Sequence, residues 1–332
     1  MTPAAPIPLV EAPLIEARAL SKVFHTGGLF RRGRPVQAVR MVDAAVARGE
    51  ALGVVGESGS GKSTLGRMML GLMPATAGTV SFDGRPLART AGPGWRALRR
   101  RMQIVFQDPY GSLDPRRRVG AQIADGLSIH RIVDAGQRAD RVAALLARVG
   151  LDPSHAQRYP HEFSGGQRQR IGLARALASE PDFLVADEPV SALDVSIQAQ
   201  IVQLLADLRR DLGLALLFIS HDLPVVRHLC DRVLVMYLGR VMEEGPAAAV
   251  FAAPAHPYTR ALISATPQLR PDRRTTRILL AGDPPSPSNP PSGCVFRTRC
   301  AHARPACAET VPELQPHGEG RRVACLRAAE IA

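Results

Sequence analysis

The sequence predicts an α/β fold in which helices cover a mainly parallel sheet and a helical subdomain is inserted into it. Three observations carry this prediction. The apolar run ALGVV, residues 51–55, is followed at once by the glycine-rich stretch GESGSGKST and then by a helical pattern. Strand-like and helix-like patterns alternate again from FLVADEP onward. Between these two parts, residues from about 109 to 180 have a purely helical texture.

The first part of the chain is predicted to contain strands. Residues 8–24 and 36–55 include short β-prone runs on either side of the loop HTGGLFRRGRP. Beyond the glycines, four apolar residues share the spacing of one helix face: Leu65, Met68, Met69 and Leu72. The glycine-rich stretch is therefore a strand-to-helix turn.

Helices dominate the middle of the chain. Proline, glycine and aspartate signals separate three predicted helices, RVGAQIADGLSIHRI, ADRVAALLARVG and GQRQRIGLARALAS. The strand FLVAD follows, and the helix after it keeps its apolar residues at helical spacing: Ile197, Ile201, Leu204, Leu205, Leu208 and Leu212. ALLFIS and RVLVMY predict two further strands.

The chain is predicted to have three parts. Residues 8–265 form one large α/β domain whose helical subdomain spans about 109–180, residues 266–293 form a linker, and residues 294–332 form a small extension. Five of the twelve residues in GDPPSPSNPPSG, 282–293, are proline, which is typical of a stiff linker. Four of the five cysteines lie in the extension.

Composition restricts the class of protein. With 332 residues, 45% of them hydrophobic, the chain can bury a large core. No apolar stretch approaches the roughly 18 residues that cross a bilayer, and the first residues do not resemble a signal peptide. We expect a cytoplasmic protein that only partner proteins hold at a membrane.

The net charge of +12 is almost entirely arginine, since Lys22 and Lys62 are the only lysines among 42 basic residues. We interpret it as a solvated surface rather than a nucleic-acid groove. Residues 85–118 are the most basic stretch, with nine arginines against Asp108 and Asp114. This stretch has two interpretations. It is attracted to anionic headgroups or acidic partner loops, or it is an ordinary solvated face.

GESGSGKST matches the pattern GxxxxGK[ST] between a strand and a helix, the context that this motif requires. Glycines let the backbone curl so that several N–H groups face one anion, and the positive end of the following helix adds to the attraction. Lys62 is predicted to neutralise the β and γ phosphates of a nucleotide, and the Ser63 hydroxyl to bind Mg²⁺. The alternative is a glycine-rich turn that binds nothing. The residues predicted to hold the nucleotide here are Gly56, Ser58, Gly59, Gly61, Lys62, Ser63 and Thr64.

Two adjacent acids end the apolar strand in FLVADEP. Asp187 is predicted to hold Mg²⁺ through water, and Glu188 to polarise a water for in-line attack on the γ-phosphate. Alone, such a pair is equally typical of a solvated strand end or a helix cap. A phosphate loop in the same chain favours the catalytic interpretation.

A second anion site is predicted in FSGGQRQR, residues 163–170. This stretch opens a helix with two glycines, so the Ser164 hydroxyl and the N–H groups near Gly166 can face an anion. One chain does not need two such sites for one phosphate.

The chain resembles the ATP-binding subunit of an ABC transporter. Six motifs of that family occur in order: GESGSGKST, FQDPYGSLDP, FSGGQ, FLVADE, SALD and ISHD. The resemblance implies a P-loop ATPase cassette with an N-terminal antiparallel β part and an inserted helical subdomain. It also implies a head-to-tail dimer in which each ATP lies between the phosphate loop of one chain and the FSGGQ signature of the other, which accounts for the second anion site.

The resemblance also implies roles for single residues. Gln107 would touch Mg²⁺ and the attacking water, Glu188 would be the catalytic base, Asp194 would communicate across the dimer, and His221 would hold the γ-phosphate. Ser164, Gly165, Gly166 and Gln167 would form the signature site.

Phe24, in LSKVFHTGG, is the best match to the aromatic residue that stacks on adenine in this family, and the alternative is an ordinary strand aromatic. The sequence departs from the family pattern at Phe163, where leucine is common, and at Val190, where threonine is usual. Neither change removes a ligand to phosphate or metal.

The region after the cassette narrows the resemblance. AHPYTRALISATP and SGCVFRTRC resemble the C-terminal region of oligopeptide and dipeptide importer ATPases, a group that includes nickel-type relatives. The partners implied are a second, related but distinct ATPase, two membrane permease subunits and an extracytoplasmic solute-binding protein, with no nucleic acid. A soluble ABC-type ATPase acting on ribosomes or DNA, and a regulatory subunit that binds ATP without turnover, are the alternatives.

Four cysteines, Cys294, Cys300, Cys307 and Cys325, follow the pattern C-x5-C-x6-C-x17-C. In a cytoplasmic chain such clustered thiols indicate a metal rather than disulfides. The resemblance favours a [4Fe-4S] cluster, and zinc and a metal-free tail remain alternatives because the spacing matches no common zinc or ferredoxin pattern. Cys230, in VRHLCDRV, is expected to be a small core residue.

Overall fold

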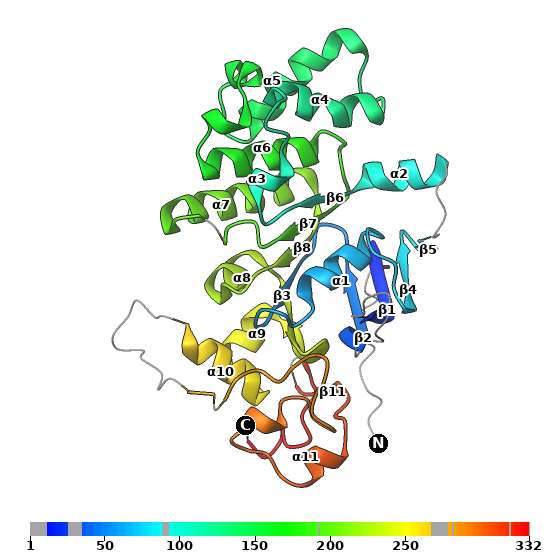
Figure 1. Ribbon diagram of the computed structural model, residues 1–332, viewed down its shortest axis with the longest axis vertical. Coiled ribbons are helices and arrows are strands. Elements are labelled where there is room, and N and C mark those ends of the chain that lie inside the picture. Colours follow the sequence, from blue (N-terminus) through cyan, green and yellow to red (C-terminus); the bar gives the residue numbers. More distant parts are fainter. Residues whose placement is uncertain are drawn as a thin grey trace, which may run out of the picture.

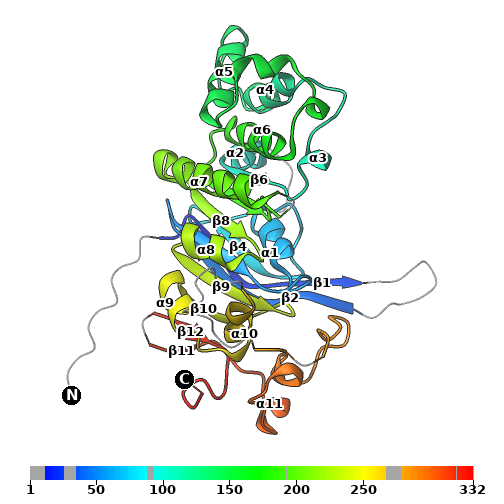
Figure 2. The ribbon, with the colours of Figure 1, turned by 90° about the vertical axis from the view of Figure 1, so that its left-hand side faces the viewer.

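The computed structural model describes residues 12–25, 35–87, 93–191, 193–266, 278–280, 282–318 and 320–331. Predictions for residues 8–11, the centre of the loop after Phe24, Ala192 of SALD and most of 266–281 lie outside these residues. Two sheets and a layer of helices form an elongated molecule, with the helical subdomain at one end and the C-terminal extension at the other (Figures 1 and 2). In the part of the chain that the structure describes, no helix has the length and apolarity to span a membrane.

A small antiparallel sheet carries the N-terminal part of the chain. Its strands are β1 (Ile15–His25), β2 (Pro35–Val46), β4 (Ala77–Phe82) and β5 (Arg85–Pro86). They lie in the order β2-β1-β4-β5, and all neighbouring pairs are antiparallel. The inner face of β1 buries Ile15, Ala17 and Leu20. This sheet is the N-terminal antiparallel part that the family resemblance implies.

The main sheet is parallel at its centre. Its strands are β3 (Ala51–Val55), β6 (Met102–Val105), β7 (Phe183–Asp187), β8 (Ala215–Ile219), β9 (Arg232–Tyr237), β10 (Arg240–Pro246), β11 (Gln315–Pro316) and β12 (Arg322–Val323). Their order is β11-β12-β10-β9-β3-β8-β7-β6, and β9, β3, β8, β7 and β6 run parallel. Every residue of β3, β7 and β8 is buried, as expected for strands covered on both faces.

The carboxyl ends of these central strands meet at one edge of the sheet. Val54 of β3 and Asp187 of β7 are both in register with Ile219 of β8. The phosphate loop, Glu188 and His221 follow these three strands directly. Segments that are far apart in the sequence thus converge where ligands bind in parallel α/β sheets.

Helix α1 (Lys62–Met69) follows the phosphate loop and buries Leu65, Met68 and Met69, as predicted. The prediction for Leu72 is wrong, because its side chain is 44% exposed. Gly71 adopts a φ of 63°, and Leu72 N–H donates to the Arg67 carbonyl at 2.8 Å. This Schellman-type end stops the helix before Leu72 can join its apolar face.

The helical subdomain packs as a separate layer at the top of Figure 1. Its helices are α3 (Pro109–Ser112), α4 (Val119–Ile129), α5 (Arg138–Arg148) and α6 (Gly165–Leu177), with 3-10 turns at Ala135–Gln137, Pro153–Gln157 and Pro160–Glu162. Val119, Ile123 and Leu127 of α4 lie 0% exposed in its core. Just before it, α2 (Pro93–Arg101) leads into β6, and Arg100 and Arg101 of the basic stretch pair with Glu180 and Asp182.

Four more helices flank the main sheet: α7 (Val195–Leu212), α8 (Leu223–Leu229), α9 (Ala247–Ala252) and α10 (Pro257–Ala265). Helix α7 buries Ile201, Leu205 and Leu208 from its predicted apolar face. Its last residue of that set, Leu212, is 38% exposed at the helix end. Cys230 is buried beside Gly53, so it is the small core residue that the sequence predicts.

The C-terminal extension packs on the cassette and continues its main sheet. It contains the 3-10 turn Arg297–Arg299, helix α11 (Ala306–Glu309), and strands β11 and β12, of which β12 pairs with β10. Val295 and Phe296 are 1% exposed and belong to the same apolar core as β9. The described linker residues 282–293 form neither helix nor strand.

Candidate functional site

The phosphate loop needs glycine at two positions for steric reasons. Gly56 has a φ of 149°, and a Cβ there would lie 2.1 Å from the Met236 carbonyl oxygen. Gly61 has a φ of 102°, and its Cβ would lie 2.1 Å from the Ala38 carbonyl oxygen. No side chain fits at either position. Because glycine has none, the backbone can curl tightly into the start of α1. The loop therefore presents its N–H groups at a helix N-terminus, as an anion site requires.

Lys62 is the first residue of α1, and its side chain folds back over the loop. The ammonium donates to the carbonyl oxygens of Gly56 at 2.8 Å and Glu57 at 2.9 Å. Burial lowers the pKa of Lys62, and the nearby carboxylates of Glu188, Asp187 and Glu57 oppose that shift. The lysine is thus a partly desolvated cation, which strengthens its attraction to a phosphate.

Ser63 and Asp187 bring the phosphate loop and β7 into contact. The Ser63 hydroxyl donates to Asp187 Oδ1 at 2.6 Å. Asp187 is 3% exposed, and burial raises its pKa. Arg67 lies 3.8 Å from the other carboxylate oxygen. A hydroxyl beside a buried carboxylate is the pair of oxygen donors that Mg²⁺ prefers next to a nucleotide.

Glu188 stands directly after β7 and meets two of the residues that the sequence singles out. Gln107 Nε2 donates to Glu188 Oε2 at 3.2 Å, and His221 Nδ1 lies 3.4 Å from the same oxygen. The backbone of Glu188 has a φ of 47°, which is unusual for a residue with a Cβ. Its N–H donates to the Ile219 carbonyl of β8 at 2.9 Å, which holds the carboxylate in this position.

These groups border an open cavity of about 460 Å³. Nine of its lining residues are predicted site residues: Phe24, Ser58, Gly59, Gly61, Lys62, Ser63, Thr64, Gln107 and Glu188. Val36, Ala38 and Pro287 also line it and escaped the sequence analysis. Asp187 and His221 adjoin the cavity through their contacts with Ser63 and Glu188.

Phe24 lies on β1 at the rim of the same cavity, with 36% of its surface exposed. The Lys22 ammonium lies 5.2 Å from the centroid of its ring. An exposed aromatic face at a nucleotide-sized cavity can stack on a base. Stacking of Phe24 on adenine stays a prediction.

The signature residues lie at the start of α6. Ser164 caps the helix: its hydroxyl accepts from Gln167 N–H at 3.3 Å, and the Gln167 side chain accepts from Ser164 N–H at 3.0 Å. A Cβ on Gly166 would lie 2.4 Å from Ile197 of α7, so glycine lets these two helices approach. Gly165 and Gly166 form the first turn. Among the described residues that line the cavity, none belongs to this motif.

Asp194 occupies the N-cap of α7. Its carboxylate accepts from Ile197 N–H at 3.0 Å and from the Ser196 hydroxyl at 2.7 Å. These hydrogen bonds lower the pKa of Asp194, the backbone bond from Ile197 first. The hydrogen bonds therefore hold Asp194 as an anion, and its side chain is exposed to solvent.

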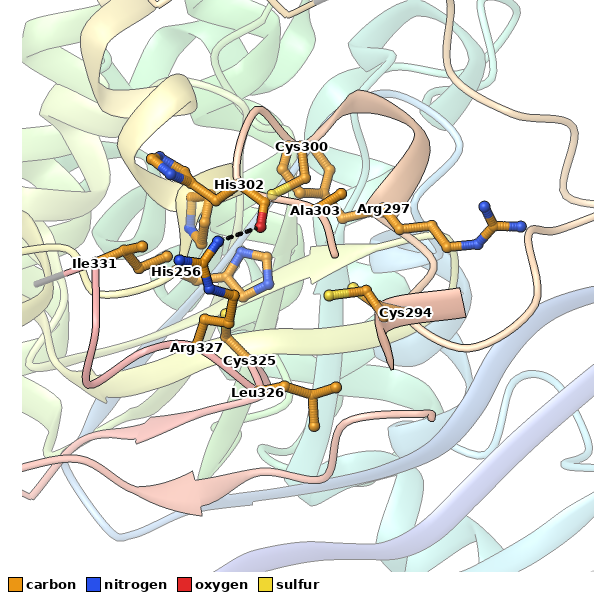
Figure 3. Close-up of a pocket in the computed structure, with 13 residues that line it drawn as sticks. His256, Cys294, Arg297, Cys300, His302, Ala303, Cys325, Leu326, Arg327 and Ile331 are labelled. Carbon is orange, nitrogen blue, oxygen red and sulfur yellow. Dashed lines mark hydrogen bonds between the residues drawn. The ribbon is translucent and has the colours of Figure 1, made fainter. Parts of the chain in front are cut away.

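The four cysteines of the extension line a second, much smaller cavity of about 20 Å³ together with His256 and Phe296. Figure 3 shows Cys294, Cys300 and Cys325 placed around it. Burial raises the pKa of Cys294 to about 11, and the three other thiols add to that shift. All four are free thiols. Within the described residues, no three His, Cys, Asp or Glu side chains are grouped to hold a metal ion.

Two family models match the chain. The model described as ABC transporter covers residues 39–191, and the model described as oligopeptide/dipeptide transporter, C-terminal region, covers residues 242–307. The chain is 47% identical over 318 residues to the dipeptide transport ATP-binding protein DppF of Escherichia coli, covering 96% of this chain and 95% of that protein.

The chain belongs to the ATP-binding proteins of ABC transporters. It is 54% identical over 319 residues to a Brucella ovis protein whose name assigns it, provisionally, to peptide import, covering 96% of this chain and 99% of that protein. The chain is accordingly an ABC ATPase that uses ATP and Mg²⁺, which confirms the predicted enzyme class.

Two solved structures confirm the predicted fold. CbiO1 of Clostridium perfringens, part of the ABC transporter complex CbiONQ, superposes with a TM-score of 0.63 at 29% identity, covering 73% of this chain and 92% of that one. The second is the ATP-binding cassette MJ0796, solved as a dimer in a post-hydrolysis state with ADP and Pi. It superposes with a TM-score of 0.61 at 26% identity, covering 70% of this chain and 98% of that one.

Proposed function

We propose that this chain is the ATP-hydrolysing motor subunit of an importer for peptides. The observation that carries the proposal is the match of residues 242–307 to the oligopeptide/dipeptide transporter C-terminal region, because it lies outside the nucleotide cassette that ABC ATPases of other functions share. The two relatives named above support it over 96% of the chain.

The working form that we propose is a head-to-tail dimer with ATP between two subunits. Support comes from the separation of the two anion sites: Lys62 and Ser63 line the cavity, whereas Ser164, Gly165, Gly166 and Gln167 are not among its lining residues. The solved MJ0796 cassette is itself a dimer. The signature of the opposite subunit would complete each cavity, and Asp194 would lie near the joint.

Glu188 is proposed as the general base. Its carboxylate borders the cavity and can accept a proton from the water that attacks the γ-phosphate of ATP. Gln107, on the same oxygen, would orient that water, and His221 would donate to the γ-phosphate. Lys62 and the loop N–H groups would stabilise the charge that develops on the phosphate oxygens.

Ser63, Asp187 and Gln107 are proposed to hold Mg²⁺. The donor set fits, because a hydroxyl, a buried carboxylate and an amide oxygen are the hard oxygen ligands that Mg²⁺ takes. Ser63 and Gln107 line the same cavity, and the Ser63 hydroxyl donates to Asp187. When bound, the ion would neutralise charge between the β and γ phosphates. Phe24 would stack on adenine, and Ser58, Gly59 and Thr64 would surround the phosphates.

Partners and location follow from the same proposal. The subunit would sit peripherally on the cytoplasmic face of the cell membrane, bound to two permease subunits. A second, related ATPase would complete the dimer, and an extracytoplasmic binding protein would deliver the solute. Within the chain, we propose residues 8–265 as the ATP-binding cassette with its helical subdomain at about 109–180, residues 266–293 as a linker, and residues 294–332 as the Cys-rich extension.

The four clustered thiols are proposed to hold a [4Fe-4S] cluster. Support comes from the four cysteines that line one small cavity, because such a cluster takes four thiolates. As the described residues are placed, no three of these thiols are grouped to hold a single metal ion, so the cluster would have to draw them together. Anaerobic purification tests this: iron, sulfide and a brown absorbance shoulder that are lost in Cys294→Ser are expected. A colourless protein without iron, or one that holds a single zinc, contradicts the cluster.

Uptake measurements test the transport proposal. In source cells that lack this gene, wild-type protein should restore uptake of a labelled dipeptide, and Glu188→Gln should not. Restored nickel uptake without peptide uptake would favour a nickel importer instead. A soluble ATPase of ribosomes or DNA would leave both uptake rates unchanged when the gene is deleted.

A further inference from the structure

The second residue of the phosphate loop, Glu57, is held by two side chains from the C-terminal third of the chain. Its backbone N–H donates to the Tyr258 hydroxyl of α10 at 2.9 Å. Its carboxylate accepts from Nη1 of Arg299, in the extension, at 3.1 Å and 2.8 Å on its two oxygens. The loop that binds phosphate is thus tied to residues more than 200 positions away.

Both partners of Glu57 are fixed in place. Tyr258 is fully buried, and the Arg299 side chain is only 9% exposed. Tyr237, Tyr258 and Phe296 form one aromatic cluster with ring centroids 4.7 to 5.4 Å apart. Arg299 also donates to the Tyr237 hydroxyl at 3.4 Å. An ion pair held in so rigid and partly desolvated a place is stronger than a surface pair.

Glu57 also contacts Lys62. Lys62 donates to the Glu57 carbonyl oxygen at 2.9 Å, so the peptide groups on both sides of Glu57 are constrained, one by Lys62 and one by Tyr258. The direction of the loop N–H groups depends on these bonds. A loop whose N–H groups are already aligned binds phosphate without a further ordering cost.

Arg299 belongs to the segment that carries the thiols. It ends the 3-10 turn Arg297–Arg299, immediately before Cys300 and five residues after Cys294. Phe296 of the aromatic cluster lines the thiol cavity, as both cysteines do. The thiol cavity and the phosphate loop therefore share one short, buried connection.

We propose that Arg299 is a positioning residue for ATP binding, which holds Glu57 so that the phosphate loop is preorganised and makes ATP affinity depend on the thiol segment. This inference rests on the proposed ATP site but requires no particular group on the thiols. Tyr258 supports the same loop from the backbone side.

The test compares Arg299→Gln with Arg304→Gln in the full chain. Arg304 is an exposed arginine of the same extension, and its ion pair is with Glu330 rather than with Glu57. Titration with a non-hydrolysable ATP analogue and Mg²⁺ should show about tenfold weaker binding for Arg299→Gln, about 1.4 kcal/mol, and unchanged binding for Arg304→Gln. Turnover at saturating ATP should stay near wild type while KM rises, and Arg299→Lys should restore part of the affinity.

A second variant distinguishes a folding defect from loss of the ion pair, because it removes the same pair at Glu57 instead of at Arg299. Glu57→Gln should weaken binding as Arg299→Gln does, and the double variant should be no weaker than either single variant. Equal affinity of Arg299→Gln and Arg304→Gln, or fully additive losses, overturns the inference. A wild-type chain that binds no ATP analogue contradicts the proposed function instead.

The thiol arm of the test uses Cys300→Ala. In the wild-type background it should weaken binding of the ATP analogue, and in the Arg299→Gln background it should have no further effect. No effect in the wild-type background, or the same loss in both, overturns the connection. Iron content, measured on the same samples, reports separately on the cluster.

Discussion

His256 makes folding stability sensitive to pH in a way that can be isolated. Its ring is 1% exposed at the start of α10, where Nδ1 accepts from Tyr258 N–H at 3.0 Å. Burial lowers the pKa of His256 to about 3, against a partial opposing effect from a hydrogen bond to the Ala324 backbone. The folded protein therefore keeps this imidazole neutral, and the extension closes over it.

The sign and size of the effect follow from linkage. The pKa of about 3 in the folded state lies below the ordinary 6.5, so the unfolded chain takes up the proton first as pH falls. Stability is fully present above pH 6.5 and declines from there toward pH 3, by up to about 1.4 kcal/mol per pH unit. Between pH 6.5 and 5 the loss from this group amounts to roughly 1.5 kcal/mol.

Urea unfolding of the wild type and of His256→Asn over pH 5 to 7 measures this loss. Asparagine can accept the Tyr258 N–H as a helix N-cap but does not titrate. All other histidines are common to both proteins, so the difference between the two pH profiles reports on His256 alone. Between pH 6.5 and 5 the free energy of unfolding should fall by roughly 1.5 kcal/mol more in the wild type than in His256→Asn. Parallel profiles would show that the ring is not held neutral under the extension, and would refute the reasoning.

Two further predictions concern the proposed ATP cavity. Glu188→Gln should lower turnover by about 10²- to 10⁴-fold, because the amide cannot accept the proton of the attacking water, while binding of ATP is retained; unimpaired hydrolysis in a phosphate-release assay contradicts Glu188 as the base. Phe24→Ala should weaken binding of the ATP analogue about tenfold and Phe24→Trp should preserve it, because a tryptophan ring can still stack; equal affinities in a fluorescence titration would assign Phe24 a merely structural role.

Most of the predicted site residues lie together in the structure because each motif directly follows a strand or opens a helix. Once β3, β7 and β8 lie parallel and in register, Lys62, Asp187, Glu188 and His221 have to meet at one edge. Gln107 comes from a loop after β6, on the same side of the sheet. Local patterns are sufficient here, since the sheet supplies the long-range geometry.

The support of the phosphate loop could not be predicted in this way. Tyr258 and Arg299 are single residues outside any nucleotide motif, 201 and 242 positions from Glu57. The packing of the extension on β9 and β10 brings Arg299 to the loop, and the packing of α10 on Tyr237 of β9 brings Tyr258 there. The prediction for Leu72 fails for a local reason, because Gly71 adopts a positive φ and α1 ends at Met69, three residues before Leu72.

We propose that ATP is bound between two subunits and that neither completes the catalytic cavity alone. A structure of the Glu188→Gln protein, assembled with its partner ATPase and with ATP and Mg²⁺, tests it most directly. The phosphates should contact Lys62 of this chain and the signature serine of the opposite subunit, while Ser164 of this chain contacts the other ATP. An ATP whose phosphates are enclosed by Lys62 and Ser164 of the same chain would contradict the account.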